Sequence, residues 1–157
     1  IIVNPNATSI PGIKNLVEML GAIPIGETLS ENKKMVKCIN HHINDGKFVT
    51  IYPEAHLWPY YTKIRPLPIS SFRFPVKDQV PSFSMTTTYQ KKRFGKRPKI
   101  TIYIDGPFYP DFKETQKEAA ISLRDKVYNQ MVLRSKNSNY EYIKYKKRID
   151  NSNDDKS

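Results

Sequence analysis

Two kinds of hydrophobic pattern alternate along this chain. In some segments the apolar residues recur with the period of a helix, and in others they form short continuous runs. Apolar residues spaced three and four apart predict a helix over 9–20 and a second helix over 30–45. Gly21 and Gly46 follow these two segments, in the position where glycine commonly ends a helix. The first half of the chain therefore predicts two amphipathic helices.

Short apolar runs between the helical segments predict strands, because strands covered on both faces are nearly continuous in hydrophobic residues. They lie at 22–25, 48–52, 80–89 and 100–104. Helices and strands thus alternate, so we expect an α/β fold with a mostly parallel sheet and helices on both faces.

Further helical signals follow. A short, irregular helix is predicted at 71–79, which contains Pro75. Thr115 and Glu118 form a capping box that starts a long helix, and the pattern allows this helix to extend as far as Arg148. The chain beyond Arg148 is polar and is predicted to fray.

The net charge of +11 and the pI near 9.7 point to an anionic partner. Nucleic acid, an anionic membrane surface and anionic substrates would each explain it. The C-terminal tail also contributes strongly to the net charge, since residues 134–148 hold six basic residues and one acidic residue, Glu141. No run of about 18 apolar residues is present, so no transmembrane helix is predicted.

The segment around residues 48–54 is the most informative for function. Its apolar strand ends abruptly at Pro53-Glu54, and aromatic and basic residues follow. A strand that delivers a carboxylate and cations to its C-terminal end commonly builds a ligand site in an α/β sheet. The predicted substrate-binding residues are Pro53, Glu54, His56, Trp58, Tyr60, Lys63 and Arg65.

Ordinary structural roles for these side chains stay open. Glu54 alone would be interpreted as a solvated loop carboxylate. Trp58 and Tyr60 fit a packed loop as well as an apolar channel wall or a bilayer interface. Lys63 and Arg65 fit solvated charges as well as phosphate ligands.

Other chemistry-bearing residues point to structure. His41, His42 and Asp45 lie at a helix end, where histidine is favoured by the helix dipole alone. Cys38 lies among apolar helix positions and is interpreted as a small core residue. The chain has no Gly-rich phosphate loop and no zinc-ligand spacing, so we expect no bound cofactor and no metal.

Several segments together resemble the glycerophospholipid acyltransferase family, whose members acylate lysophosphatidic acid and related lysolipids. Residues 20–25 resemble the second motif of the family, residues 46–54 its third, and residues 80–81 with the strand after them its fourth. Residues 58–66 and 102–111 resemble a bacterial branch of this 1-acylglycerol-3-phosphate type family.

The chain departs from the family at its catalytic motif. That motif, His followed by four residues and Asp, is absent from these 157 residues and is expected upstream of Ile1. Residues 55–57 are Ala, His and Leu where the third motif usually has Gly, Thr and Arg. Residues 26–27 replace the usual arginine of the second motif. Phosphate binding would then fall to Lys63 or Arg65.

The resemblance implies an O-acyltransferase of phospholipid biosynthesis with a glycerolipid acyltransferase-like fold that is incomplete at its N-terminus. Residues 1–133 would form the C-terminal part of the acyltransferase domain. Residues 134–157 would form a basic tail, partly helical and then disordered. The complete enzyme would transfer a fatty acyl group from acyl-CoA or acyl-carrier protein, its co-substrate, to a lysophospholipid or glycerophosphate hydroxyl. This chain alone is expected to be inactive.

The resemblance also implies a location and partners. A lysophospholipid acceptor, an acyl donor and an anionic membrane surface are the expected partners. The protein would lie peripherally on the cytoplasmic face of the membrane.

The alternative interpretations are a basic nucleic-acid-binding module and a non-catalytic lipid-binding relic. Residues 91–99 are strongly basic, and Tyr140, Tyr142 and Tyr145 interleave with cations further along. Aromatic residues among cations are typical of single-strand binders. The acyltransferase interpretation, by contrast, does not expect nucleic acid as a partner.

Overall fold

The computed structural model describes residues 1–3, 21–26, 28–54 and 58–146. The helix predicted at 9–20, the candidate site residue His56 and the tail from residue 147 onward lie outside these described residues. In chain order the elements are β1 (Ile2–Val3), β2 (Ile23–Pro24), α3 (Leu29–Asn44), the 3₁₀ turn η1 (Ile69–Phe72), α4 (Arg73–Lys77), β3 (Ser82–Gln90), β4 (Lys99–Phe108) and α5 (Gln116–Ser135).

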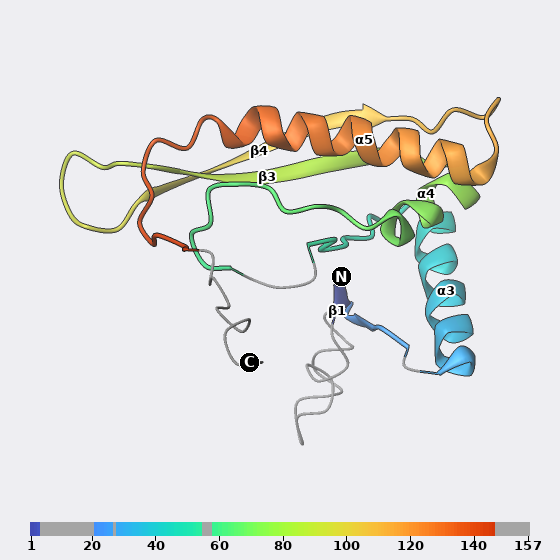
Figure 1. Cartoon of the computed structure of the whole chain (residues 1–157). Coiled ribbons are helices and arrows are strands. Elements are labelled where there is room, and N and C mark those ends of the chain that lie inside the picture. Colours follow the sequence, from blue (N-terminus) through green and yellow to red (C-terminus); the bar gives the residue numbers. More distant parts are fainter. Residues whose placement is uncertain (4–20, 27, 55–57, 147–157) are drawn as a thin grey trace, which may run out of the picture.

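A long antiparallel hairpin and one helix form the larger part of the molecule. Strands β3 and β4 pair over most of their length, with Thr86 opposite Tyr103 and a bulge between Ser82 and Ser84. Helix α5 lies along one face of this hairpin (Figure 1). The strands predicted at 80–89 and 100–104 are thus confirmed, although β4 is longer than the apolar run because it continues to Phe108.

The hydrophobic core lies between α5 and the segment that precedes β3. Helix α5 begins at the predicted capping box, in which Thr115 accepts from the backbone of Glu118 and the Glu118 carboxylate accepts from the backbone of Thr115. Its buried face meets residues of the 64–76 segment, η1 and α4 included. The buried members of this cluster are Leu67, Phe72, Val76, Ala119, Ala120, Leu123, Val127 and Met131.

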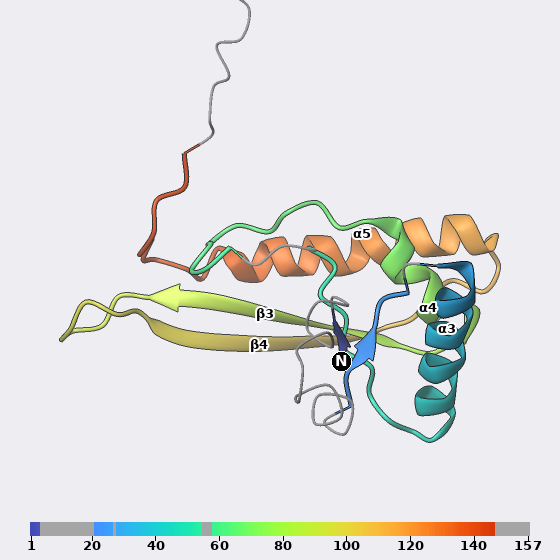
Figure 2. The same ribbon diagram turned by 90° about the horizontal axis from the view of Figure 1, so that it is seen from below.

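The N-terminal part is much smaller. Strands β1 and β2 pair in parallel over two residues each. Helix α3 also starts with a capping box, here between Thr28 and Glu31, two residues before the Ser30 start suggested by the sequence. It stands at the end of the molecule where α5 begins, next to α4 (Figures 1 and 2). The buried hydrophobic residues of this N-terminal part, among those described, are Ile23 in β2 and Ile39 in α3.

The predicted mostly parallel sheet with helices on both faces is wrong. The described residues form two separate two-stranded sheets, of which only the two-residue β1–β2 pair is parallel. The physical reason lies at residues 48–52, the expected central strand. This segment forms no ladder, and among the described residues its backbone link to β1 is one hydrogen bond, from Ile2 N to Thr50 O at 2.9 Å.

The segment after α5 also differs from its prediction. The helix ends at Ser135, so the extension toward Arg148 does not occur over the described residues 136–146. The chain instead turns back across the end of β3, where the backbone N–H groups of Asn139 and Tyr140 both donate to Tyr89 O. Within the described part of the chain, no helix is long and apolar enough to cross a membrane.

Candidate functional site

Two parts of the predicted site are joined by hydrogen bonds between Glu54 and Arg65. The backbone N–H of Arg65 donates to Glu54 Oε2 at 3.1 Å, and Arg65 Nη1 donates to the backbone O of Glu54 at 3.1 Å. Both residues are half-buried. The carboxylate at the end of the third-motif-like segment therefore fixes the backbone at Arg65, and Arg65 in return holds the turn at Glu54.

Trp58 forms one wall of this site. The Arg65 guanidinium carbon lies 4.7 Å from the centre of a Trp58 ring, a distance at which cation–π attraction operates. Tyr61 meets Trp58 edge-on, with ring centroids 5.0 Å apart. The indole also stacks on Tyr145, with centroids 5.1 Å apart and the ring planes 19° from parallel. The cation of Arg65 thus sits against a π face that two tyrosines hold in place.

Tyr60 forms a second set of ring contacts, with β3 and with the segment after α5. Its ring meets Tyr142 edge-on at 4.8 Å and lies 5.4 Å from the Tyr89 ring. Its φ of 59° is uncommon for an aromatic residue, so these ring contacts hold a backbone conformation that the residue would otherwise disfavour. Burial, and then the neighbouring Tyr60 and Tyr145, raise the pKa of Tyr89.

We call this group the aromatic cluster. It joins three segments that are far apart in the sequence: the loop after Glu54, the end of β3 and the chain after α5. The cluster consists of two sets of ring contacts: Trp58 with Tyr61 and Tyr145, and Tyr60 with Tyr89, Tyr142 and, through Tyr142, Tyr140.

The basic turn between β3 and β4, residues 91–98, is tied to the aromatic cluster. The backbone N–H of Lys91 donates to Asn139 Oδ1 at 2.9 Å, and Tyr140 Oη donates to Lys96 O at 3.2 Å. Tyr145 Oη closes the other side by donating to Pro59 O at 2.9 Å. Cations and aromatic rings from three segments are therefore neighbours on one surface.

The structure brings most of the predicted site residues together. Pro53 and Glu54 are half-buried at the start of the loop, Arg65 lies against Trp58, and Tyr60 contacts Tyr89 and Tyr142. Lys63 is exposed two residues before Arg65. Sequence reasoning placed the tyrosines of residues 140–145 in the alternative function only. Their interleaving with cations was the available signal, but it did not reveal that they pack on Trp58 and Tyr60.

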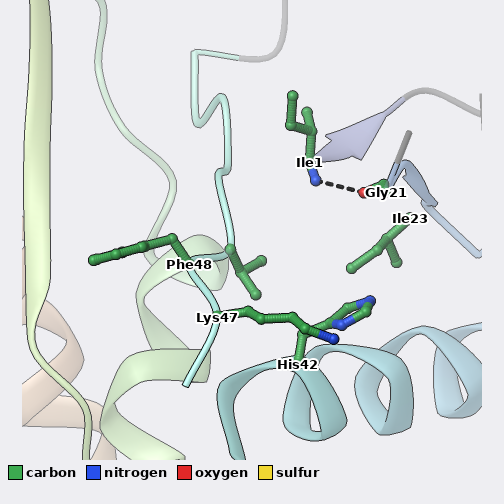
Figure 3. Close-up of a pocket in the computed structure, with 7 residues that line it drawn as sticks. Ile1, Gly21, Ile23, His42, Lys47 and Phe48 are labelled. Atoms are coloured by element: carbon green, nitrogen blue, oxygen red, sulfur yellow. Dashed lines mark hydrogen bonds between the residues drawn. The ribbon is translucent and has the colours of Figure 1, made fainter. Parts of the chain in front are cut away.

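A separate cavity of about 250 Å³ lies between β2, the end of α3 and residues 47–49. Figure 3 shows His42 and Lys47 side by side in it, whereas Phe48 points away toward β3. The Nδ1 atom of His42 is buried and has no hydrogen-bond partner among the described residues. The cavity is otherwise lined by apolar side chains and backbone, and it contains no acid–base pair.

His41 and Asp45 lie close together on the surface at the end of α3. His41 Nε2 lies 3.6 Å from Asp45 Oδ2, and the His41 side chain is 70% exposed. The pKa of Asp45 is lowered mainly by its hydrogen bond from Lys47, whose Nζ lies 3.1 Å from the same oxygen. These residues therefore stabilise the end of α3, as the sequence indicated, and give no catalytic dyad.

The donor set of the described residues does not suit a metal. No group of three or more His, Cys, Asp or Glu side chains within the described ranges could hold an ion. What the Glu54–Arg65 region offers is a fork-shaped cation beside aromatic faces, which suits a phosphate attached to an apolar chain.

Comparison with known proteins found no match. No family model, curated protein or solved structure is significantly similar to this chain.

Proposed function

We propose that this chain provides the acceptor-binding part of a glycerophospholipid acyltransferase. The observation that carries the proposal is the pair of hydrogen bonds between Glu54 and Arg65, with the Arg65 guanidinium against Trp58. They unite the third-motif-like segment with the segment that resembles the bacterial branch of the family. The α/β sheet expected from that resemblance is not part of the proposal.

Each residue of this site has a role that follows from its chemistry. Arg65 binds the acceptor phosphate through its planar fork of N–H donors, and the exposed Lys63 adds a point charge. Glu54 positions Arg65 by accepting from its backbone N–H. Trp58 and Tyr60 offer apolar ring faces to the acyl chain of the lysolipid.

The reaction itself needs a group that these 157 residues do not supply at the spacing of the family. In the proposed transfer, the acceptor hydroxyl attacks the thioester carbonyl of the acyl donor, the C–S bond breaks, and the thiol leaves. A general base takes the hydroxyl proton. None of the three histidines of the chain is followed by four residues and then an aspartate, and His41 is separated from Asp45 by three residues. The role of this chain is therefore to bind and orient the acceptor.

The first test is to measure binding of a short-chain, water-soluble lysophosphatidic acid by calorimetry. Arg65→Ala should weaken binding by about tenfold or more, because a hydrogen bond to a charged group contributes about 1.5–3 kcal/mol. Arg65→Lys should fall between, since it keeps the charge and loses the fork. Arg73→Ala, which removes an exposed arginine on α4, is the matched control and should bind like the wild type.

Equal binding by the wild type and Arg65→Ala would remove Arg65 from the acceptor site. The coding sequence immediately upstream of Ile1 supplies an independent test. A His, four residues and an Asp in frame there would support acyl transfer by the longer protein. An unrelated sequence or a stop codon would count against it.

One observation favours the alternative, a nucleic-acid-binding module. The basic turn 91–98 and the tyrosines of residues 140–145, its two components, lie side by side through the hydrogen bonds of Asn139 and Tyr140. The salt dependence of binding distinguishes nucleic-acid binding from lysolipid binding. Binding to a single-stranded oligonucleotide should fall steeply as salt rises, because cations on phosphates release counterions. Lysolipid binding should depend on salt less, since Lys63 and Arg65 contact a single phosphate and the aromatic contacts are not screened.

A further inference from the structure

The two faces of the β3–β4 hairpin have the reverse of the usual polarity. The face that α5 covers is polar: Ser84, Thr86 and Thr88 are buried there, and Thr86 lies opposite Tyr103. The outer face is apolar and open. Its exposed hydrophobic residues are Phe83, Met85, Ile100, Ile102 and Ile104.

This reversal is unusual because an antiparallel sheet with one face covered normally turns its hydrophobic residues inward and its polar residues toward water. Here Met85 lies opposite Ile104, and the two side chains are 51% and 70% exposed. Phe48, 88% exposed, continues the face, because its ring meets Phe83 edge-on at 6.3 Å. A contiguous apolar surface of this kind marks an interaction site.

The tip of the same hairpin is strongly basic. No acidic residue occurs between Asp78 and Asp105, and the exposed Phe94, 79% accessible, lies in the middle of the turn. Figures 1 and 2 show that this tip projects beyond the end of α5. The cations of the turn and its borders are Lys91, Lys92, Arg93, Lys96, Arg97 and Lys99, all exposed.

We propose that the outer face of the β3–β4 hairpin docks on an anionic lipid bilayer. The aliphatic side chains of β3 and β4 and Phe94 enter the interfacial region, while the cations of the tip contact lipid phosphates. Charge complementarity selects this occupant, because the exposed cations at the tip suit lipid phosphates and the aliphatic side chains beside them suit the interfacial region.

The docked orientation connects with the proposed function. The basic turn is hydrogen-bonded to the segment that carries the aromatic cluster, through Tyr140 and Lys96. A hairpin that lies on the bilayer therefore keeps this cluster near the lipid surface, from which a lysolipid would arrive. The docking residues differ from those of the acceptor site, so either proposal can fail while the other stands.

Flotation with vesicles tests this docking. Vesicles of phosphatidylcholine alone are compared with vesicles that also contain phosphatidylglycerol, and the wild-type chain should float only with the second. The double variant Ile102→Ser with Ile104→Ser should lose about tenfold or more of its binding, because each substitution removes an aliphatic side chain that the bilayer would bury. Leu133→Ser, which removes an exposed leucine of α5, should bind like the wild type.

A charge variant keeps the test independent of folding. Lys92→Ala with Arg93→Ala alters only exposed side chains of the turn, and each cation removed should reduce partition to anionic vesicles about fivefold. Both variants should still bind the water-soluble lysophosphatidic acid, which separates this proposal from the acceptor site.

Three results would overturn the docking proposal. The first is equal flotation of the wild type and both double variants. The second is a wild-type dimer in light scattering that the Ile102→Ser and Ile104→Ser substitutions convert to a monomer, which would make the face an interface between copies. The third is flotation of the wild type with vesicles of phosphatidylcholine alone that equals its flotation with vesicles containing phosphatidylglycerol.

Discussion

The regions before and after residues 55–57 are built very differently. Among the described residues of 1–54, the strands are two residues long and the buried hydrophobic residues are Ile23 and Ile39. In residues 58–146, strands of nine and ten residues pair with each other, and a helix of 20 residues packs beside them. Over the described residues, the second region has a continuous core, whereas Ile23 and Ile39 of the first lie outside that core.

The difference teaches that strong local signals do not suffice for a sheet. Residues 48–52 are as apolar as a buried strand, yet Phe48 and Tyr52 are largely exposed and the segment forms no ladder. Strands β3 and β4 are adjacent in the chain, so a short turn pairs them. A parallel pairing of residues 48–52 would need a second strand that a longer crossover connection places beside them.

The largest expected effect comes from shortening one buried side chain in each of the two regions. Leu123→Ala removes a fully buried side chain of the α5 cluster and should lower the free energy of unfolding by about 3 kcal/mol. Ile39→Ala should instead weaken α3 and leave the hairpin intact. Hydrogen exchange of the two regions is the measurement.

Leu133→Ala, which truncates an exposed residue of α5, is the control and should change little. If Ile39→Ala reduced protection of β3 and β4 as much as Leu123→Ala does, the two regions would form one cooperative unit and the contrast drawn above would be lost.

A smaller effect is expected from the two capping boxes, which are chemically matched. Thr28→Ala and Thr115→Ala each remove a side chain that accepts from the third backbone N–H of its helix, and each should cost about 1 kcal/mol locally. Thr115→Ala should lower the thermal midpoint of the whole molecule, because α5 carries the core. Thr28→Ala should change only exchange within α3. If Thr28→Ala lowered the thermal midpoint of the whole molecule and Thr115→Ala did not, the N-terminal region would contribute more to global stability than α5.

The smallest effect concerns the ion pair that fastens α5 to β4. Arg134 donates to both carboxylate oxygens of Asp105, through Nε at 3.0 Å to each oxygen, and its guanidinium lies 4.9 Å from the Tyr103 ring centre. The hydrogen bond from Arg134 lowers the pKa of Asp105. A lowered pKa means that this carboxylate stabilises the fold above its unfolded pKa of about 3.9 and loses that contribution as the pH falls through its folded pKa.

The difference in unfolding free energy between the wild type and Asp105→Asn should therefore be constant above about pH 5 and shrink below about pH 4. Arg134→Ala should show the same loss, and the double variant should lose little more than either single one. Urea denaturation at a series of pH values measures this. A difference that does not change with pH would show that the pair contributes nothing through its charge.

Part of the candidate site could be predicted from the sequence, since a turn after an apolar run followed by aromatic and basic residues singled out Glu54, Trp58, Tyr60 and Arg65. The aromatic cluster could not. Tyr145 stacks on Trp58 across 87 positions of the chain, and no local pattern encodes such a contact. The exposure of the apolar face of the hairpin could not be predicted either. The alternation of apolar and polar residues shows that β3 and β4 have one face of each kind, but not which face the helix covers.

The sequence alone determined the helices that begin at capping boxes and the hairpin strands on either side of the basic turn, because caps, periodicity and turns act between residues close in the chain. Tertiary structure decided how these elements pair. It left residues 48–52 without a ladder, turned Ser84 and Thr86 toward α5, and brought the segment after α5 onto Trp58. Those outcomes depend on which surfaces meet in space, and the free energy of that burial is shared among residues far apart in the chain.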